Sequence, residues 1–222
     1  MENDLDTDGF CWLRSAFDRS EINVLQKQMD ALKTETSKAG QRLSQTEFDG
    51  IRLINGSQIC HDTLSNSLGN DFVLLRVILF DKSSDSPWLV KWHRDTMIPV
   101  KEHKESDMLK SHSMKDDVPH VRATVEILTH MLSLRIHLDD ADASNGALRV
   151  IRGSHCVEHL STAHRAEDYD ENEIETCTAK AGDVLCIRPL LLHASSKPVS
   201  GMRRRILHME FTAKQSLPDG FE

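Results

Sequence analysis

The sequence predicts a mainly β (α+β) fold, a sandwich or barrel that carries helices near its N-terminus. Two patterns support this prediction. An amphipathic segment with helical spacing comes early in the chain, and short apolar runs separated by glycine turns follow it. Alternating polar and apolar residues in such runs are typical of half-buried strands. With 222 residues the chain is long enough to bury a sizeable core, and we expect one domain over 1–222.

The N-terminal part of the chain is expected to supply the helices. Asp18 precedes Glu21 by three positions, an arrangement that caps the start of a helix. Ile22, Leu25 and Met29 then follow at helical spacing, so this helix should pack against a sheet. In order, we expect a strand at 9–17, a helix at 19–36, a loop at 37–50, a short strand at 51–54 and a helix at 58–68.

The middle of the chain contains a buried strand and a long polar segment. Residues 72–80 form a nearly continuous apolar run that only Arg76 interrupts, which predicts a buried strand. A turn at 82–87 and a strand at 88–95 should follow. Residues 97–120 are rich in lysine and acidic residues. We predict a long loop there, because polar segments of this length are usually lids, binding loops or disordered.

The last hundred residues show mainly β patterns. Asn145-Gly146 and Gly182-Asp183 are strong turn signals. We expect a short helix at 122–131 and strands at 134–139, 147–151, 175–179, 184–187, 190–193 and 203–212.

The composition excludes several classes of protein. The net charge of −8 argues against bulk nucleic-acid binding, which needs clustered lysine and arginine. No apolar run approaches the length of a membrane span, and the acidic start lacks a signal-peptide core. We therefore expect a cytoplasmic monomer or weak dimer that acts on a small molecule. The five cysteines are scattered and suggest neither a disulfide framework nor a zinc finger: Cys11, Cys60, Cys156, Cys177 and Cys186.

A His-x-Asp pair, His93 and Asp95, is the first candidate for chemistry. Residues i and i+2 of a strand point to the same side, so both side chains could bind one metal ion. His193 lies in a later β segment and is the candidate third ligand. Two histidines and one carboxylate leave coordination positions open, as in non-haem Fe(II) oxygenases. A His-x-Asp pair also occurs by chance in a chain with twelve histidines, as an ordinary polar pair.

The arginine cluster that follows His193 is the second candidate. On the last predicted strand, Arg204 shares a face with His208, whereas Arg203 and Arg205 share the opposite face with apolar residues. An arginine facing a cavity can bind a carboxylate through two hydrogen bonds. The alternative is a run of solvent-facing arginines, which is the commoner case.

Arg76 and Arg135 each interrupt an apolar strand and are further candidates. A buried arginine requires a partner, so either could contact a ligand if its face lines the interior. For Arg135, exposure on an outer face is an equally good interpretation. His155 and His208 are candidates for groups that support the site, although each by itself is best explained by a structural role.

Several motifs of the chain occur together in the order Asp8-Gly9-Phe10, Trp92-His93-Arg94-Asp95, His137 to Ala141 with Asn145 to His155, and Gly182-Asp183 before Leu192-His193-Ala194-Ser195. In these motifs and their order the chain resembles the phytanoyl-CoA dioxygenase family of Fe(II)/2-oxoglutarate oxygenases. The resemblance covers nearly the whole chain. It departs from the family at Arg152, where proline is usual, and at Arg94, where glutamine is common.

The resemblance implies a double-stranded β-helix (jelly roll, cupin-like barrel) with N-terminal helices packed on one sheet. It implies that His93, Asp95 and His193 bind Fe(II), and that 2-oxoglutarate chelates this iron. The distal carboxylate of 2-oxoglutarate would meet Arg204, with Ser195 as a hydroxyl partner. Such enzymes use O2 to hydroxylate a C–H bond and release succinate and CO2. Related halogenases lack the carboxylate ligand, so Asp95 favours hydroxylation.

The leading hypothesis is therefore a Fe(II)- and 2-oxoglutarate-dependent hydroxylase of a small organic substrate. The alternative is a cupin-type isomerase or hydrolase that uses another divalent metal, which two histidines and one aspartate would also suit. A barrel that binds a ligand without catalysis is a third possibility. Arg204 discriminates between the first two, because only a 2-oxoglutarate enzyme needs a cation for the distal carboxylate.

Overall fold

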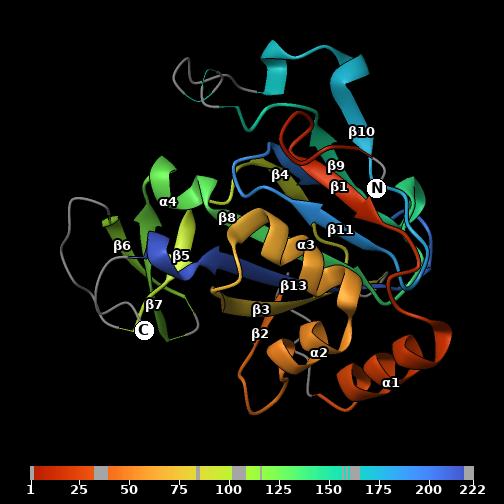
Figure 1. Ribbon diagram of the computed structural model, residues 1–222. Coiled ribbons are helices and arrows are strands. Elements are labelled where there is room, and N and C mark those ends of the chain that lie inside the picture. The colour runs from red at the N-terminus through yellow and green to blue at the C-terminus, as the bar shows by residue number, and fades with distance from the viewer. Residues whose placement is uncertain are drawn as a thin grey trace.

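Two antiparallel sheets form the body of the structure, a computed structural model, and a small third sheet lies beside them, at the left of Figure 1. The structure describes residues 3–32, 40–83, 86–101, 109–115, 117–156, 158, 160 and 166–217, with only the backbone at 109–112.

The larger sheet has the strand order β1-β11-β8-β13-β3-β2. Its strands are β1 (Phe10–Leu13), β11 (Val184–Ile187), β8 (Met131–His137), β13 (Arg204–Ala213), β3 (Phe72–Lys82) and β2 (Gln41–Leu43). β13 pairs with β8 on one side and β3 on the other. Because side chains alternate along a strand, β13 presents a different set of residues to each face of the sheet. One face carries Leu207, Met209 and Phe211, and the other carries Arg204, His208 and Glu210.

The smaller sheet has the order β10-β9-β12-β4 and covers the inner face of the larger one. Its strands are β10 (Ile174–Thr176), β9 (Leu148–Ile151), β12 (His193–Ser195) and β4 (Val90–His93). Phe10, Trp12 and Leu185 of the larger sheet pack against Leu148 and Val150 of the smaller one. The predicted mainly β jelly roll is confirmed, and this apolar cluster fills one part of the space between its sheets.

Helices cover the outer face of the larger sheet, as predicted (Figure 1). They are α1 (Arg19–Asp30), α2 (Gly50–Gly56) and α3 (Gln58–Leu68). Asp18 and Glu21 form the predicted capping box: the Asp18 carboxylate accepts from the Glu21 N–H at 2.9 Å, and the Glu21 carboxylate accepts from the Asp18 N–H at 2.7 Å. Ile22 and Leu64 are fully buried beneath their helices, and each such side chain contributes roughly 1.5–3 kcal/mol of burial energy. By packing on its outer face, these helices stabilise the sheet that carries Arg204.

The elements predicted at 37–50 and 51–54 are wrong. The first segment is not all loop, because it contains β2, which pairs with β3 at the edge of the larger sheet. The second is helix α2 rather than a strand, and the Asp49 carboxylate caps it by accepting from the Arg52 N–H at 3.0 Å. Short apolar runs fit either element, and the cap decides for the helix. The predicted helix at 19–36 ends at Asp30, and 33–39 lie outside the described residues.

The long loop predicted at 97–120 is also wrong in its described part. It contains β5 (Met97–Pro99), β6 (Leu109–Lys115) and the start of β7 (Val118–Ala123), in a sheet of order β5-β7-β6. Ile98 and Val121 anchor this sheet against α4 (Val125–Thr129), where a helix was expected at 122–131. The many charged residues of this segment made its few apolar positions hard to recognise in the sequence as parts of strands. Residues 102–108 and Asp116 lie outside the described residues, so a lid over the site stays a prediction.

Two strand boundaries matter for the site. The strand expected at 88–95 ends at His93, and Asp95 follows in the connection to β5, where its N–H donates to the Pro189 carbonyl at 2.9 Å. The strand expected at 190–193 begins only at His193. The two histidines thus lie opposite each other on paired strands, in the register His193↔His93.

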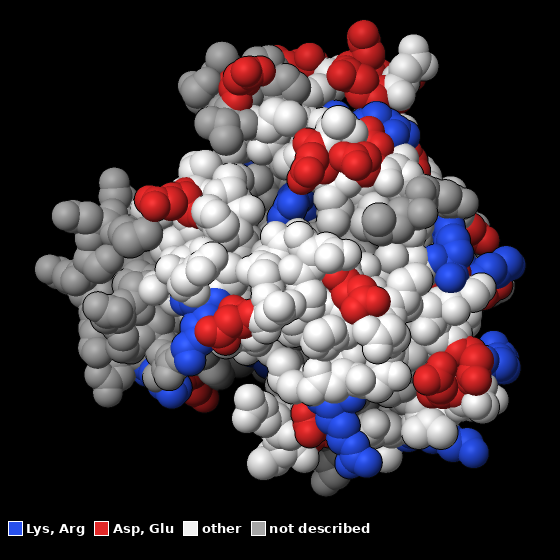
Figure 2. Space-filling view, in the orientation of Figure 1, with Lys and Arg blue, Asp and Glu red and all other residues white. Residues whose placement is uncertain are grey.

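Acidic and basic side chains are interspersed with uncharged surface on the face shown in Figure 2. Among the described helices, none combines the length and the apolar character that crossing a membrane requires. The short 3-10 turns are η1 (Ala143–Asn145), η2 (Ala166–Asp168), η3 (Glu171–Glu173) and η4 (Lys214–Ser216).

Candidate metal centre and anion pocket

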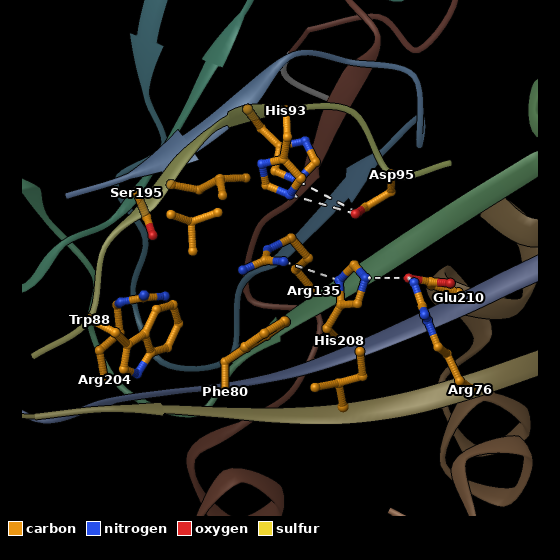
Figure 3. A pocket seen from close by; sticks show the side chains of 14 residues that line it. Arg76, Phe80, Trp88, His93, Asp95, Arg135, Ser195, Arg204, His208 and Glu210 are labelled. Carbon is orange, nitrogen blue, oxygen red and sulfur yellow. Dashed lines mark hydrogen bonds and ion pairs between the residues drawn. The ribbon is translucent and has the colours of Figure 1, made fainter. Parts of the chain in front are cut away.

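His93 and Asp95 lie at one end of a cavity between the two sheets (Figure 3). His193 lines the same cavity, and these three residues form a candidate metal site that is called the metal group below. Two distances define the group: 3.6 Å from His93 Nε2 to Asp95 Oδ1, and 3.5 Å from His193 Nε2 to Asp95 Oδ2. The imidazole centroids are 4.2 Å apart, and the candidate ligand atoms of all three residues lie within 4.8 Å of one another. Asp95 joins the histidines through the connection after β4, not through strand alternation.

Hydrogen bonds fix which nitrogen of each histidine faces the cavity. His93 Nδ1 lies 2.8 Å from the Lys91 carbonyl, and His193 Nδ1 lies 2.8 Å from the Leu191 carbonyl. A carbonyl only accepts, so each Nδ1 carries the proton and each Nε2 keeps its lone pair for a metal. The His193 side chain is 5% exposed and that of His93 is 38% exposed, so the group opens to solvent on the His93 side.

The protonation states of this group suit metal binding. Burial acts to raise the pKa of Asp95, but the charges of His193, His208 and Arg76 outweigh it and lower the pKa to about 2. Burial lowers the pKa of His193 to about 4. At neutral pH the site therefore presents a carboxylate and a neutral imidazole, the forms that coordinate metal ions.

Arg204 lies at the other end of the same cavity and is 2% exposed. Its Nε donates to the Asn145 carbonyl at 3.3 Å, and no carboxylate of the described residues forms an ion pair with it. Burial, followed by the charge of Arg135, lowers the pKa of Arg204 to about 9. Arg203 and Arg205 point to the opposite face, where they pair with Asp81 and Asp139. Arg204 is thus a buried cation that faces the cavity.

Lys82 is a functional candidate that the sequence reasoning missed. It is fully buried, and its Nζ donates to the Ser195 hydroxyl at 3.1 Å and to the Ser196 carbonyl at 2.7 Å. The ammonium also lies 4.2 Å from the centroid of the Trp88 ring. Burial, followed by the charges of Arg204 and Arg135, lowers the pKa of Lys82 to about 7. Extending the alternation of Arg76, Ile78 and Phe80 by one step would have placed Lys82 on this face.

The remaining candidates form a buried network beside Asp95. Arg76 donates to Glu210 at 2.5 Å, His208 Nε2 lies 3.0 Å from the same Glu210 oxygen, and Arg135 lies 3.1 Å from His208 Nδ1. Asp95, His208 and Glu210 are also close enough to form a metal group, but these hydrogen bonds already occupy His208 and Glu210.

His155 does not reach the metal group. It lines a separate cavity of about 370 Å³ with Arg188 and Leu190. None of the cysteines lines the cavity that contains the metal group, and all five are free thiols.

The cavity that joins the metal group to Arg204 has a volume of about 110 Å³. Pockets for drug-sized ligands are larger, about 300–1,000 Å³. The side chains that line this small cavity come mainly from β3, β8 and β13 of one sheet and from β4, β9 and β12 of the other. The arrangement can hold one metal ion at one end and the anionic group of a small ligand at the other.

Several solved structures have the same fold as this chain. HygX from Streptomyces hygroscopicus, solved with nickel and 2-oxoglutarate bound, is 13% identical with a TM-score of 0.63, over 95% of this chain and 85% of that chain. AviO1 from Streptomyces viridochromogenes Tue57 is 17% identical with a TM-score of 0.64, over 96% and 94%. SnoN, a non-haem α-ketoglutarate-dependent epimerase from nogalamycin biosynthesis, is 14% identical with a TM-score of 0.64, over 94% and 77%.

Sequence comparison identifies the family directly. No curated protein is significantly similar to the chain in sequence. The family model described as phytanoyl-CoA dioxygenase (PhyH) matches residues 5–206, which include the metal group, Lys82 and Arg204. The chain belongs to the phytanoyl-CoA dioxygenase family.

Proposed function

We propose that this protein is a Fe(II)- and 2-oxoglutarate-dependent dioxygenase that hydroxylates a small organic substrate and releases succinate and CO2. One observation carries the proposal: a group of two histidines and one carboxylate shares a small cavity with a buried arginine that has no carboxylate partner among the described residues. Family membership supports it. We also propose that the chain forms a single domain.

The residues present fit Fe(II) and 2-oxoglutarate. His93, Asp95 and His193 would hold the metal through two Nε2 atoms and a carboxylate, the donor set of non-haem iron sites. Arg204 would receive the distal carboxylate of 2-oxoglutarate, aided by Lys82 and the Ser195 hydroxyl that Lys82 contacts. A buried cation without a counterion is unfavourable, so these residues favour an anionic ligand.

When bound, iron and 2-oxoglutarate supply the activation of O2 and the oxidation of a C–H bond. The chain itself contributes binding and orientation. Arg204 and Lys82 fix one end of the cosubstrate, and the apolar side chains of Val90, Leu148 and Phe80 line the cavity and exclude water. The opening beside His93 would admit the primary substrate.

The reaction type is proposed as hydroxylation because Asp95 completes the metal group. Other outcomes occur on this fold: SnoN is an epimerase, and SnoK is a carbocyclase from the same biosynthesis. The experiment incubates the protein with Fe(II), 2-oxoglutarate, ¹⁸O₂ and a panel of small candidate substrates. A substrate that stimulates succinate release and gains one labelled oxygen supports hydroxylation. Stimulated succinate release with an unlabelled, rearranged product would contradict it.

Lys82 should make cosubstrate binding depend on pH. An anion stabilises its protonated form, so the affinity of the metal-loaded protein for 2-oxoglutarate should fall as the pH rises through about 7. Titration of 2-oxoglutarate at several pH values, followed by Trp fluorescence, measures this. Lys82→Met should flatten the dependence, whereas Lys27→Met on α1 should retain it. A slope unchanged by Lys82→Met would exclude Lys82 as its source.

Lys82 should make the stability of the ligand-free protein depend on pH in the opposite direction. The pKa of Lys82 is about 7 in the folded chain, against an ordinary value of 10.5. Between these values the unfolded chain binds more protons, so the contribution of Lys82 to the free energy of unfolding rises with pH. Ligand binding and stability should therefore respond to pH in opposite directions.

A further inference from the structure

Arg135 is a buried cation in the middle of the cavity that the proposed roles leave unexplained. It lies on β8 directly opposite His208 of β13, and its side chain lines the cavity. Figure 3 shows its guanidinium between the metal group and the end where Arg204 and Trp88 lie. The carbon at the centre of the guanidinium is 5.3 Å from the centroid of the Phe80 ring. Arg135 therefore lines the cavity that a ligand extending from the metal group to Arg204 would occupy.

A chain of hydrogen bonds fixes the orientation of Arg135. Glu210 accepts from Arg76 and from His208 Nε2, so His208 carries its proton on Nε2. His208 Nδ1 is then an acceptor, and it receives one N–H of Arg135 at 3.1 Å. Burial lowers the pKa of His208, which agrees with a neutral acceptor. Arg76, Glu210 and His208 therefore act as positioning residues for Arg135.

No carboxylate of the described residues forms an ion pair with Arg135, although the charges of Asp95 and Glu210 act on it. Its Nε has no hydrogen-bond partner within the described part of the chain, and the residue is 7% exposed. Glu210 is occupied by Arg76 and His208, and Asp95 belongs to the metal group. Burial lowers the pKa of Arg135 to about 10, so it stays charged at neutral pH. A buried charge without an ion-pair partner favours binding of an anion from outside the chain.

The size of the cavity limits which anionic ligand can pair with Arg135. At about 110 Å³ it accommodates one small molecule between the metal group and Arg204. We propose that Arg135 binds the carboxylate next to the 2-oxo group of 2-oxoglutarate, while Arg204 and Lys82 bind the distal carboxylate. This inference rests on the proposed function and deepens it. Two separate cationic subsites would make the site selective for 2-oxo acids with a carboxylate at each end.

The test measures binding rather than turnover, with three ligands that separate the two subsites. 2-Oxoglutarate has both carboxylates. 2-Oxobutyrate has only the carboxylate beside the oxo group, whereas 4-oxopentanoate has the ketone and only the distal carboxylate. Each is titrated into Zn(II)-loaded protein by calorimetry. The variants are Arg135→Gln, Arg135→Lys, Arg204→Gln and the control Arg52→Gln, which changes a surface arginine of α2.

Arg135→Gln is expected to lower the affinity for 2-oxoglutarate and 2-oxobutyrate at least about tenfold. The affinity for 4-oxopentanoate should stay within about twofold of the wild-type value. Arg204→Gln should show the reciprocal pattern, and Arg52→Gln should change none of the three. Arg135→Lys keeps the charge but loses the fork of donors, so it should show the Arg135→Gln pattern with a smaller loss. This variant provides the test if Arg135→Gln fails to fold, which thermal unfolding reports.

Each other outcome is decisive. If the variants at Arg135 bind 2-oxoglutarate like the wild type while Arg204→Gln loses it, the role of Arg135 is overturned and the proposed function stands. Equal weakening of 2-oxobutyrate and 4-oxopentanoate would also overturn it, because the effect would not be specific to one carboxylate. If metal-loaded wild type binds no 2-oxoglutarate, the proposed function fails and this inference fails with it.

Discussion

Replacing His193 with alanine is expected to abolish iron binding and succinate formation together. His193 is one of the two proposed imidazole ligands of the metal group, and its buried ring is held by the Leu191 carbonyl. Loss of a residue that merely supports a ligand typically costs 10–100-fold in metal affinity, so loss of the ligand itself should cost at least about 100-fold. Iron content after reconstitution and dialysis, and succinate release with 2-oxoglutarate and O2, measure the two effects.

A matched control separates this effect from general damage. His61→Ala changes a histidine of α3 that lies outside the cavity, and it should keep both iron and activity. Thermal unfolding of both variants should confirm that they fold. If His193→Ala retained wild-type iron content and succinate release, His193 would not be a metal ligand.

Replacing Arg204 with methionine should raise the 2-oxoglutarate concentration needed for half-maximal activity by about 30-fold or more. Arg204 is buried at the end of the cavity with no carboxylate partner among the described residues, so its charge is available to the ligand. Removing one partner of a buried, hydrogen-bonded charge pair typically costs about 2–5 kcal/mol, which corresponds to that factor or more. Succinate release at varied 2-oxoglutarate concentrations measures it.

Arg203→Met is the matched control for this prediction. Arg203 precedes Arg204 in the chain but pairs with Asp30 and Asp81 on the opposite face, so its loss should leave the 2-oxoglutarate requirement within about twofold. If Arg204→Met behaved like Arg203→Met, the distal carboxylate would bind elsewhere. A wild-type protein that releases no succinate from 2-oxoglutarate would instead favour the alternative, an isomerase or hydrolase that uses another divalent metal.

The parts of the fold that could be predicted depend on patterns within single segments. On the last strand His208 and Glu210 alternate with Leu207, Met209 and Phe211, and the structure places this strand at the centre of the larger sheet. The capping box of Asp18 and Glu21 likewise predicted the start of α1. Such patterns can be read from the sequence because they depend on neighbouring residues in the same segment, or on a single apolar surface against which that segment packs.

The parts that could not be predicted depend on partners far away in the chain. β2 is a polar segment that becomes a strand only because β3 offers it an edge. The charged stretch at 97–120 forms strands because β7 pairs with both β5 and β6. Lys82 is an intermediate case at the site. The alternation along β3 indicates the face of the sheet on which it lies, but its contacts with Ser195 and Trp88 depend on the tertiary structure.

The sequence and the structure bring His93, Asp95 and His193 together in different ways. Sequence reasoning placed His93 and Asp95 together by strand alternation, but the strand ends at His93. In the connection that follows, the Asp95 N–H donates to the Pro189 carbonyl, and the Asp95 carboxylate lies beside both histidines. The residue types could be read from the sequence, whereas their geometry depends on this tertiary contact with the segment before His193.

The most direct test of the account is the absorption spectrum of the wild-type protein under anaerobic conditions. Addition of Fe(II) and 2-oxoglutarate should produce a visible charge-transfer band, because both must bind at one site for the band to appear. The band should be absent without 2-oxoglutarate and in His93→Ala, which lacks a ligand of the metal group. Failure of the wild-type protein to develop the band with both components present would contradict the proposed site.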